Sequence, residues 1–114
     1  MESPLHTIDV AHPPRHPDAV ERDVLDALVH VRRSSHLRVL KIIHGYGSSG
    51  KGGSTKEIVK NALFRQRSRC VTIIDGERYG LLDADTEALR AAAGQFPDQD
   101  LGAANPGITV VWVK

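Results

Sequence analysis

The sequence has a single cysteine, no apolar run long enough to cross a membrane, and no basic or apolar leader at its N-terminus. A lone cysteine excludes an internal disulfide, and its place beside Val71 predicts that Cys70 is a small buried hydrophobic residue. A membrane-spanning helix needs about 18 or more consecutive apolar residues, and none are found. We therefore expect a soluble, cytoplasmic protein that has no membrane partner.

The formal net charge of +1 hides two segments of opposite sign. Residues 31–69 hold ten lysines and arginines against one acid, a net of +9, whereas residues 75–100 have a net of −5. A basic half favours a polyanionic partner, and an acidic half limits non-specific binding. At 114 residues the chain has the size of one domain, residues 1–114, built around one core.

Hydrophobic periodicity predicts alternating strands and helices in the order β-α-β-α-β-(β)-α-β. Turn residues and capping residues set the boundaries between them. The fold class is α/β, a two-layer βαβα-type sandwich with a mixed sheet. The predicted elements are strand 5–10, helix 17–33, strand 37–43, helix 54–64, strand 70–74, a short strand 79–82, a helix that Asp83 or Asp85 caps and that ends near Gly94, and strand 108–113.

A glycine-rich loop with one lysine joins the second predicted strand to the second predicted helix. Glycine tolerates positive φ and has no Cβ, so such a loop can turn several N–H groups toward one anion. The helix after it opens at Ser54 with Glu57 three residues on, a capping-box pattern that points a positive dipole end at the same place. We predict that a phosphate binds here, and that its ligands are Gly45, Tyr46, Gly47, Ser48, Ser49, Gly50, Lys51, Gly52, Lys56 and Lys60.

Three other interpretations of this loop stay open. Residues 45–51 fit the first seven positions of a P-loop, but Gly52 replaces the hydroxyl residue that binds magnesium. Residues 45–50 also fit the dinucleotide-binding pattern G-x-G-x-x-G, with Asp75 as the ribose-binding acid, although the helix starts late for that motif. The third interpretation is a flexible glycine-serine linker.

The segment Ile42-Ile43-His44-Gly45-Tyr46-Gly47 and the closing stretch from Asn105 to Val113 resemble those of the small MutS-related (Smr) domain family. Members of that family typically carry Leu-Asp-x-His on the first strand and His-Gly-x-Gly after the second. The resemblance covers nearly the whole chain from Leu5 onward. It implies a fold similar to the C-terminal domain of translation initiation factor 3, and it implies binding of DNA or RNA, in several members with nicking-endonuclease or RNase activity.

The first of these motifs is altered in this chain. Ile8-Asp9-Val10 aligns with Leu-Asp-x, but Ala11 stands at the histidine position and His12 comes one residue late. One residue along a strand points the side chain to the opposite face, so His12 can serve only where the strand ends or bulges. The candidate catalytic residues are Asp9, His44 and His12.

These observations leave several functions open. Metal-independent cleavage needs a base, an acid and donors for phosphate charge, which Asp9, His44 and Lys51 can supply. A small-molecule nucleotide binder and a non-catalytic interaction scaffold are the alternatives. We predict no cofactor and no metal site, and make no prediction of oligomeric state. Residues 1–4 are expected to be disordered, and residues 75–107 to form an extended insertion before the last strand.

Overall fold

The computed structural model describes residues 2–46 and 54–114. It contains four strands, three α-helices and one short 3-10 helix, and it confirms the predicted α/β fold with a mixed sheet. Within these residues no helix is long and apolar enough to span a membrane. The elements are β1 (Leu5–Asp9), α1 (Pro17–Arg33), β2 (Val39–Ile43), α2 (Thr55–Arg65), η1 (Arg67–Arg69), β3 (Cys70–Asp75), α3 (Ala84–Ala93) and β4 (Ile108–Val113).

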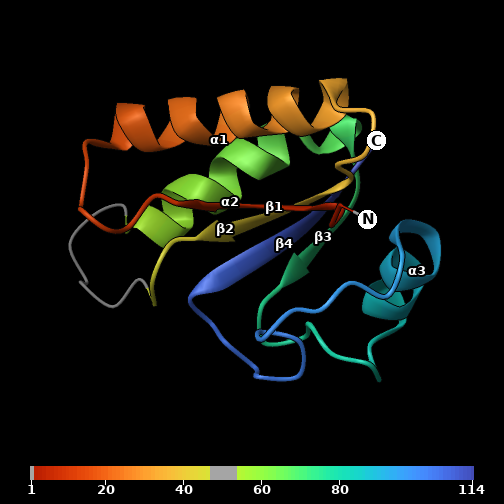
Figure 1. Cartoon of the computed structure of the whole chain (residues 1–114). Coiled ribbons are helices and arrows are strands. Elements are labelled where there is room, and N and C mark those ends of the chain that lie inside the picture. Colours follow the sequence, from red (N-terminus) through yellow and green to blue (C-terminus); the bar gives the residue numbers. More distant parts are fainter. Residues whose placement is uncertain (1, 47–53) are drawn as a thin grey trace.

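The four strands form one sheet in the order β1-β2-β4-β3. Strands β1 and β2 are parallel, and β4 runs antiparallel to both β2 and β3. The carboxyl ends of β1, β2 and β3 and the start of β4 therefore meet at one edge of the sheet (Figure 1). Because Asp9 pairs with Ile43, the ends of the two parallel strands lie side by side, and His44 follows directly after Ile43.

Helices α1 and α2 cover one face of the sheet (Figure 1). Apolar residues at helical spacing on α1, including Val20, Val24 and Leu28, pack with Leu40 and Ile42 of β2 in the first hydrophobic cluster. Cys70 is buried in the same cluster, as expected for a small hydrophobic residue. Helix α2 starts where the capping pattern predicts, since the Ser54 hydroxyl accepts a hydrogen bond from the Glu57 N–H at 3.2 Å.

The segment between β3 and β4 covers the opposite face with a second hydrophobic cluster. Because side chains alternate along a strand, Val39 and Ile43 of β2 point into this cluster, whereas Leu40 points into the first. Leu89 of α3 and Phe96 pack against them. The acidic half of the sequence thus forms a second core layer beneath the sheet.

The predicted short strand 79–82 is wrong, because residues 76–78 and 81–82 form turns and residues 79–80 lie between them outside any strand. Backbone hydrogen bonds from Arg78 to Asp75 and from Tyr79 to Gly76 close these turns. A half-buried strand needs an apolar face, but Leu82 is fully exposed and Leu81 is exposed beside it. Among residues 79–82, only Tyr79 is buried in the second cluster. Buried and exposed side chains therefore do not alternate along this segment as they do in a strand.

A buried ionic network joins this segment to the sheet. Lys41 of β2 contacts Asp98 at 2.5 Å and Asp100 at 2.7 Å, and the side chains of Lys41 and Asp98 are only 6% and 1% exposed. The Tyr79 hydroxyl donates to Asp98 at 2.8 Å. Burial alone would lower the pKa of Lys41, but its hydrogen bonds to both carboxylates raise it, so it stays charged. Lys41 belongs to the basic segment of the sequence, yet it points inward.

We expect Lys41→Met to destabilise the fold strongly, because Asp98 and Asp100 would then face each other without a cation. Breaking a buried ion pair from one side costs about 3 kcal/mol or more in the free energy of unfolding. Urea denaturation measures this loss. The matched control is Lys60→Met, which removes a half-exposed pair with Asp75 and should cost less than about 1 kcal/mol. Equal losses in the two variants would contradict this account of Lys41.

Candidate functional site

The edge of the sheet where the strands end collects most of the predicted site residues. We call it the loop end, and we define it as residues 9–16, 44–46, 54–60 and 105–109. It joins the carboxyl ends of β1 and β2, the start of β4, and the N-terminal ends of α1 and α2 (Figure 1). Segments far apart in the sequence therefore meet at one place, as sites on α/β sheets commonly require.

Asp9 and His12 form a pair at the end of β1. The strand ends at Asp9, so the chain turns back and brings the His12 Nδ1 to 3.0 Å from Asp9 Oδ2. Asp9 Oδ1 also accepts hydrogen bonds from the N–H groups of Ala11 at 2.9 Å and His12 at 3.0 Å. Because β1 ends at Asp9, His12 comes after the strand, and its ring can lie beside the Asp9 carboxylate.

The carboxylate of Asp9 is held in its charged form. Partial burial alone would raise its pKa, but the hydrogen bonds from Ala11 and His12 outweigh burial and leave the pKa below its ordinary value. His12 is largely exposed, whereas Asp9 is about one third exposed. The pair therefore presents a solvent-facing imidazole supported by an ionised carboxylate.

His44 is buried, with 2% of its surface exposed, and both of its ring nitrogens have partners. Nδ1 lies 2.8 Å from the Gly45 carbonyl oxygen, which can only accept, so Nδ1 carries the proton. Nε2 then accepts from the Thr109 hydroxyl at 2.8 Å. Burial lowers the pKa of His44, and the nearby charges of Lys56 and Lys60 lower it further, so the ring is neutral.

The loop begins at a fixed point because β2 is tied to the segment before β4. The N–H groups of His44 and Gly45 both donate to the Gly107 carbonyl, at 2.9 and 3.1 Å. Gly45 has φ +77°, a conformation that favours glycine. The Asn105 side-chain oxygen accepts from the Gly107 N–H at 2.9 Å. The described part of the first stretch that carries the family resemblance, residues 42–46, thus contacts the second stretch, residues 105–113.

The remaining predicted residues divide into three groups. Tyr46, three residues after the end of β2, is 69% exposed. Lys56 lies in the first turn of α2, and Lys60, one turn further, pairs with Asp75 at 3.0 Å. The predicted ligands Gly47, Ser48, Ser49, Gly50, Lys51 and Gly52 lie outside the described residues.

The sequence reasoning missed Thr109, the partner of His44. The two residues are 65 positions apart, so no local pattern joins them. The available signal was a threonine in an apolar strand, which has to find a hydrogen-bond partner when it is buried. In the part of the chain that the structure describes, no group of three or more His, Cys, Asp or Glu side chains is arranged to hold a metal ion.

The neutral state of His44 predicts a pH dependence of stability. Its folded pKa is below the 6.5 of an unperturbed histidine, so below about pH 6.5 the unfolded chain binds more protons than the folded one. Stability should then fall as the pH decreases from 6.5 toward the folded pKa. We expect His44→Gln to be less stable at neutral pH but to lose less on acidification, measured by urea denaturation between about pH 7 and 5.

The wild type and this variant share His6, whose pKa is also lowered by burial and by His30, so the difference between the curves isolates His44. Parallel curves for the two proteins would contradict a buried neutral imidazole at this position.

The fold can be compared with known proteins. No protein-family model and no curated protein sequence matches the chain. Among solved structures, the fold is similar to the Smr domain of Thermus thermophilus MutS2, with a TM-score of 0.54. The alignment covers 96% of this chain and 96% of that one, at 19% sequence identity. At this level of identity the likeness concerns the fold. The chain therefore has the fold of an Smr domain, as its sequence predicts.

Proposed function

We propose that the chain binds nucleic acid through the loop end. One observation carries the proposal: the N-terminus of α2, with Lys56 in its first turn, begins at the edge where β1 and β2 end, close enough for the Lys56 charge to lower the pKa of His44. A helix N-terminus attracts phosphate through its free N–H groups and its dipole. The resemblance to the Smr family implies the same class of ligand.

Each part of this edge has a role in the proposal. Tyr46 offers an aromatic face on which a base can stack, and its exposure leaves that face accessible. Lys56 and Lys60 add positive charge near the phosphate. In this proposal the buried ring of His44 acts by positioning Gly45 through its hydrogen bonds to the Gly45 carbonyl and the Thr109 hydroxyl.

The binding test uses the full chain with fluorescently labelled single-stranded DNA, duplex DNA and RNA. Tyr46→Ala combined with Lys56→Gln should weaken binding about tenfold or more, because one stacked base alone contributes about 1–3 kcal/mol. The matched control is Leu82→Ala combined with Arg78→Gln, which removes one exposed apolar group and one cation from the turns before α3. The proposal fails where both double variants bind as well as the wild type.

Salt dependence separates this function from that of a small-molecule nucleotide binder. Binding of a polynucleotide weakens steeply with salt because counterions are released, whereas a single nucleotide gives a shallow slope. The dinucleotide hypothesis also assigns Asp75 to a ribose, yet its carboxylate contacts Lys60. A shallow slope together with tight binding of a mononucleotide would favour that alternative.

A second candidate function, cleavage of the bound strand, rests on the Asp9–His12 pair. With Nδ1 donating to Asp9, the Nε2 of His12 can take the proton of an attacking hydroxyl as its oxygen bonds to phosphorus. The P–O bond to the leaving oxygen then breaks, and that oxygen takes a proton from water. Asp9 would hold the ring in this tautomer and stabilise the imidazolium that forms. Lys56 and the helix N-terminus would stabilise the charge that builds on the phosphate.

We expect the wild-type chain to nick supercoiled DNA or to cut structured RNA in a gel assay. His12→Ala and Asp9→Asn should each slow cutting by about 100-fold or more, because a positioned general base typically contributes that factor. His36→Ala, which removes an exposed histidine at the other end of the molecule, is the control. A wild type that binds without cutting would reduce the function to binding alone.

A further inference from the structure

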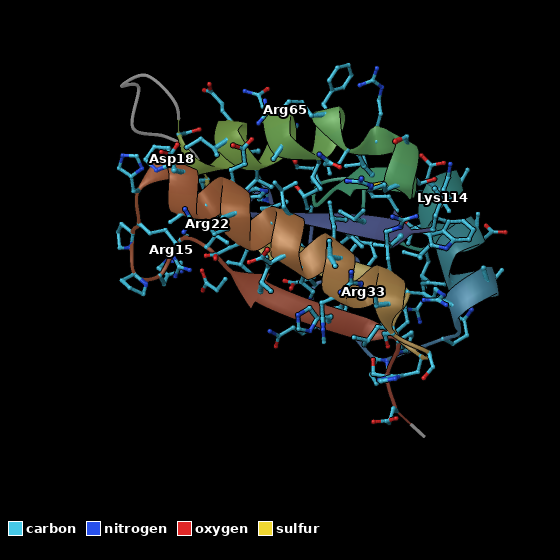
Figure 2. All side chains as sticks on the ribbon, turned by 90° about the horizontal axis from the view of Figure 1, so that it is seen from above. Arg15, Asp18, Arg22, Arg33, Arg65 and Lys114 are labelled. Atoms are coloured by element: carbon cyan, nitrogen blue, oxygen red, sulfur yellow. The ribbon has the colours of Figure 1, made fainter. Side chains whose placement is uncertain are left out.

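The end of the molecule opposite the loop end carries a group of exposed cations. We call it the basic pole and define it as Arg32, Arg33, Arg67, Arg69 and Lys114. Arg32 and Arg33 lie in the last turn of α1, Arg67 and Arg69 form the ends of η1, and Lys114 follows β4. Figure 2 shows Arg33 and Lys114 toward one end of the molecule, with Arg15 and Asp18 toward the other.

The C-terminal residue Lys114, η1 and the start of β3 lie close together. The Lys114 N–H donates to the Arg69 carbonyl at 3.0 Å, and Cys70 pairs with Val113 between the last two strands. Burial raises the pKa of the Cys70 thiol, and the positive charges of Lys114 and Arg32 oppose that rise. Arg32 and Lys114 therefore lie near the start of β3, together with η1.

Helix capping explains only part of this group. Basic residues are common at helix C-termini because they offset the negative end of the dipole. At α1, however, Arg38 already donates to the carbonyls of Val31, Ser34 and Leu37. At α2, Arg67 donates to the Phe64 carbonyl at 2.7 Å. The exposed side chain of Arg33, in the last turn of α1, takes no part in these capping hydrogen bonds.

An exposed aromatic ring lies within the basic pole. Phe64 is 62% exposed, and the Arg67 guanidinium lies 4.0 Å from the centre of its ring. The sequence has no acid from residue 58 to residue 74, the stretch that holds Phe64, Arg67 and Arg69. Cations beside an exposed planar ring are the arrangement that binds single-stranded nucleic acids, because phosphates pair with the cations and bases stack on the ring.

We propose that the basic pole is a second binding surface for single-stranded nucleic acid, separate from the loop end. Phosphates would contact Arg32, Arg33 and Lys114, and a base would stack on the Phe64–Arg67 pair. The two surfaces lie at opposite ends of α2, an 11-residue helix about 16 Å long. Substitutions at one surface can therefore be made without touching the other.

The test measures binding of the full chain to labelled oligothymidylate and to a short DNA duplex. Arg33→Gln combined with Lys114→Gln should weaken oligothymidylate binding about tenfold and reduce the slope of log K against log salt by about 1.4, because each lost phosphate contact removes about 0.7. Phe64→Ala should weaken binding of the single strand and leave the duplex unchanged. The matched control is Arg22→Gln combined with Arg78→Gln, two exposed cations outside the basic pole.

The outcomes separate this inference from the proposed function. Loss of binding in the pole variants but not in the control supports the basic pole. Wild-type binding in the pole variants, with loss in Tyr46→Ala/Lys56→Gln, overturns the basic pole and leaves the loop end standing. Binding of the wild type to phosphatidylserine vesicles, but to neither oligonucleotide, overturns both proposals in favour of an anionic membrane surface.

Discussion

The hydrogen-bonded imidazole of His44 fixes the geometry on which the loop end depends. A neutral histidine has one donor and one acceptor, and here they join the Gly45 carbonyl at the end of β2 to the Thr109 hydroxyl at the start of β4. The ring is buried, so neither bond competes with water. Because Gly107 also accepts from two consecutive N–H groups of the same stretch, the start of the loop has little freedom to move.

The basic segment of the sequence separates in the fold because its strand and helices carry it from one edge of the sheet to the other. It begins at the end of α1, enters β2, and returns along α2. Lys41 therefore points into the second core, Lys56 and Lys60 reach the loop end, and the arginines of η1 reach the basic pole. A net charge summed along the chain cannot show this separation, because it ignores direction.

The sequence predicted those parts of the fold that depend on local periodicity. The spacing of Val20, Val24 and Leu28 gave α1 with its observed bounds, and the capping pattern at Ser54 placed the start of α2. The prediction of a short strand at 79–82 was wrong because apolar residues form a strand only where one face is buried, and Leu82 is exposed to solvent. The pattern of buried and exposed positions also explains why the fold is similar to the Smr domain of MutS2 at 19% identity, since this pattern can persist where the residues themselves change.

The candidate site was harder to predict than the fold, because its contacts join residues that are far apart in the sequence. The candidates Asp9 and His44 came from the motif resemblance, and the parallel pairing of β1 and β2 brings the ends of their strands side by side. The partner of His44 was not found, since Thr109 is brought to it only by the antiparallel β4. The place of His12 depended on where β1 ends, and a difference of one residue decides whether its ring meets Asp9. The ends of strands are set by pairing between strands, which cannot be predicted from the local sequence.

The dipoles of α1 and α2 act in opposite ways at the two proposed surfaces. In the proposed loop-end site the helix presents its positive end and free N–H groups, so the backbone itself would attract a phosphate. At the basic pole the C-termini of α1 and α2 present negative ends, which repel a phosphate. Side chains there have to offset the helix carbonyls before any attraction remains. Arg38 and Arg67 bind those carbonyls, and the further arginines then leave a net positive surface. An anion-binding surface built at helix C-termini therefore needs more cations than one built at a helix N-terminus.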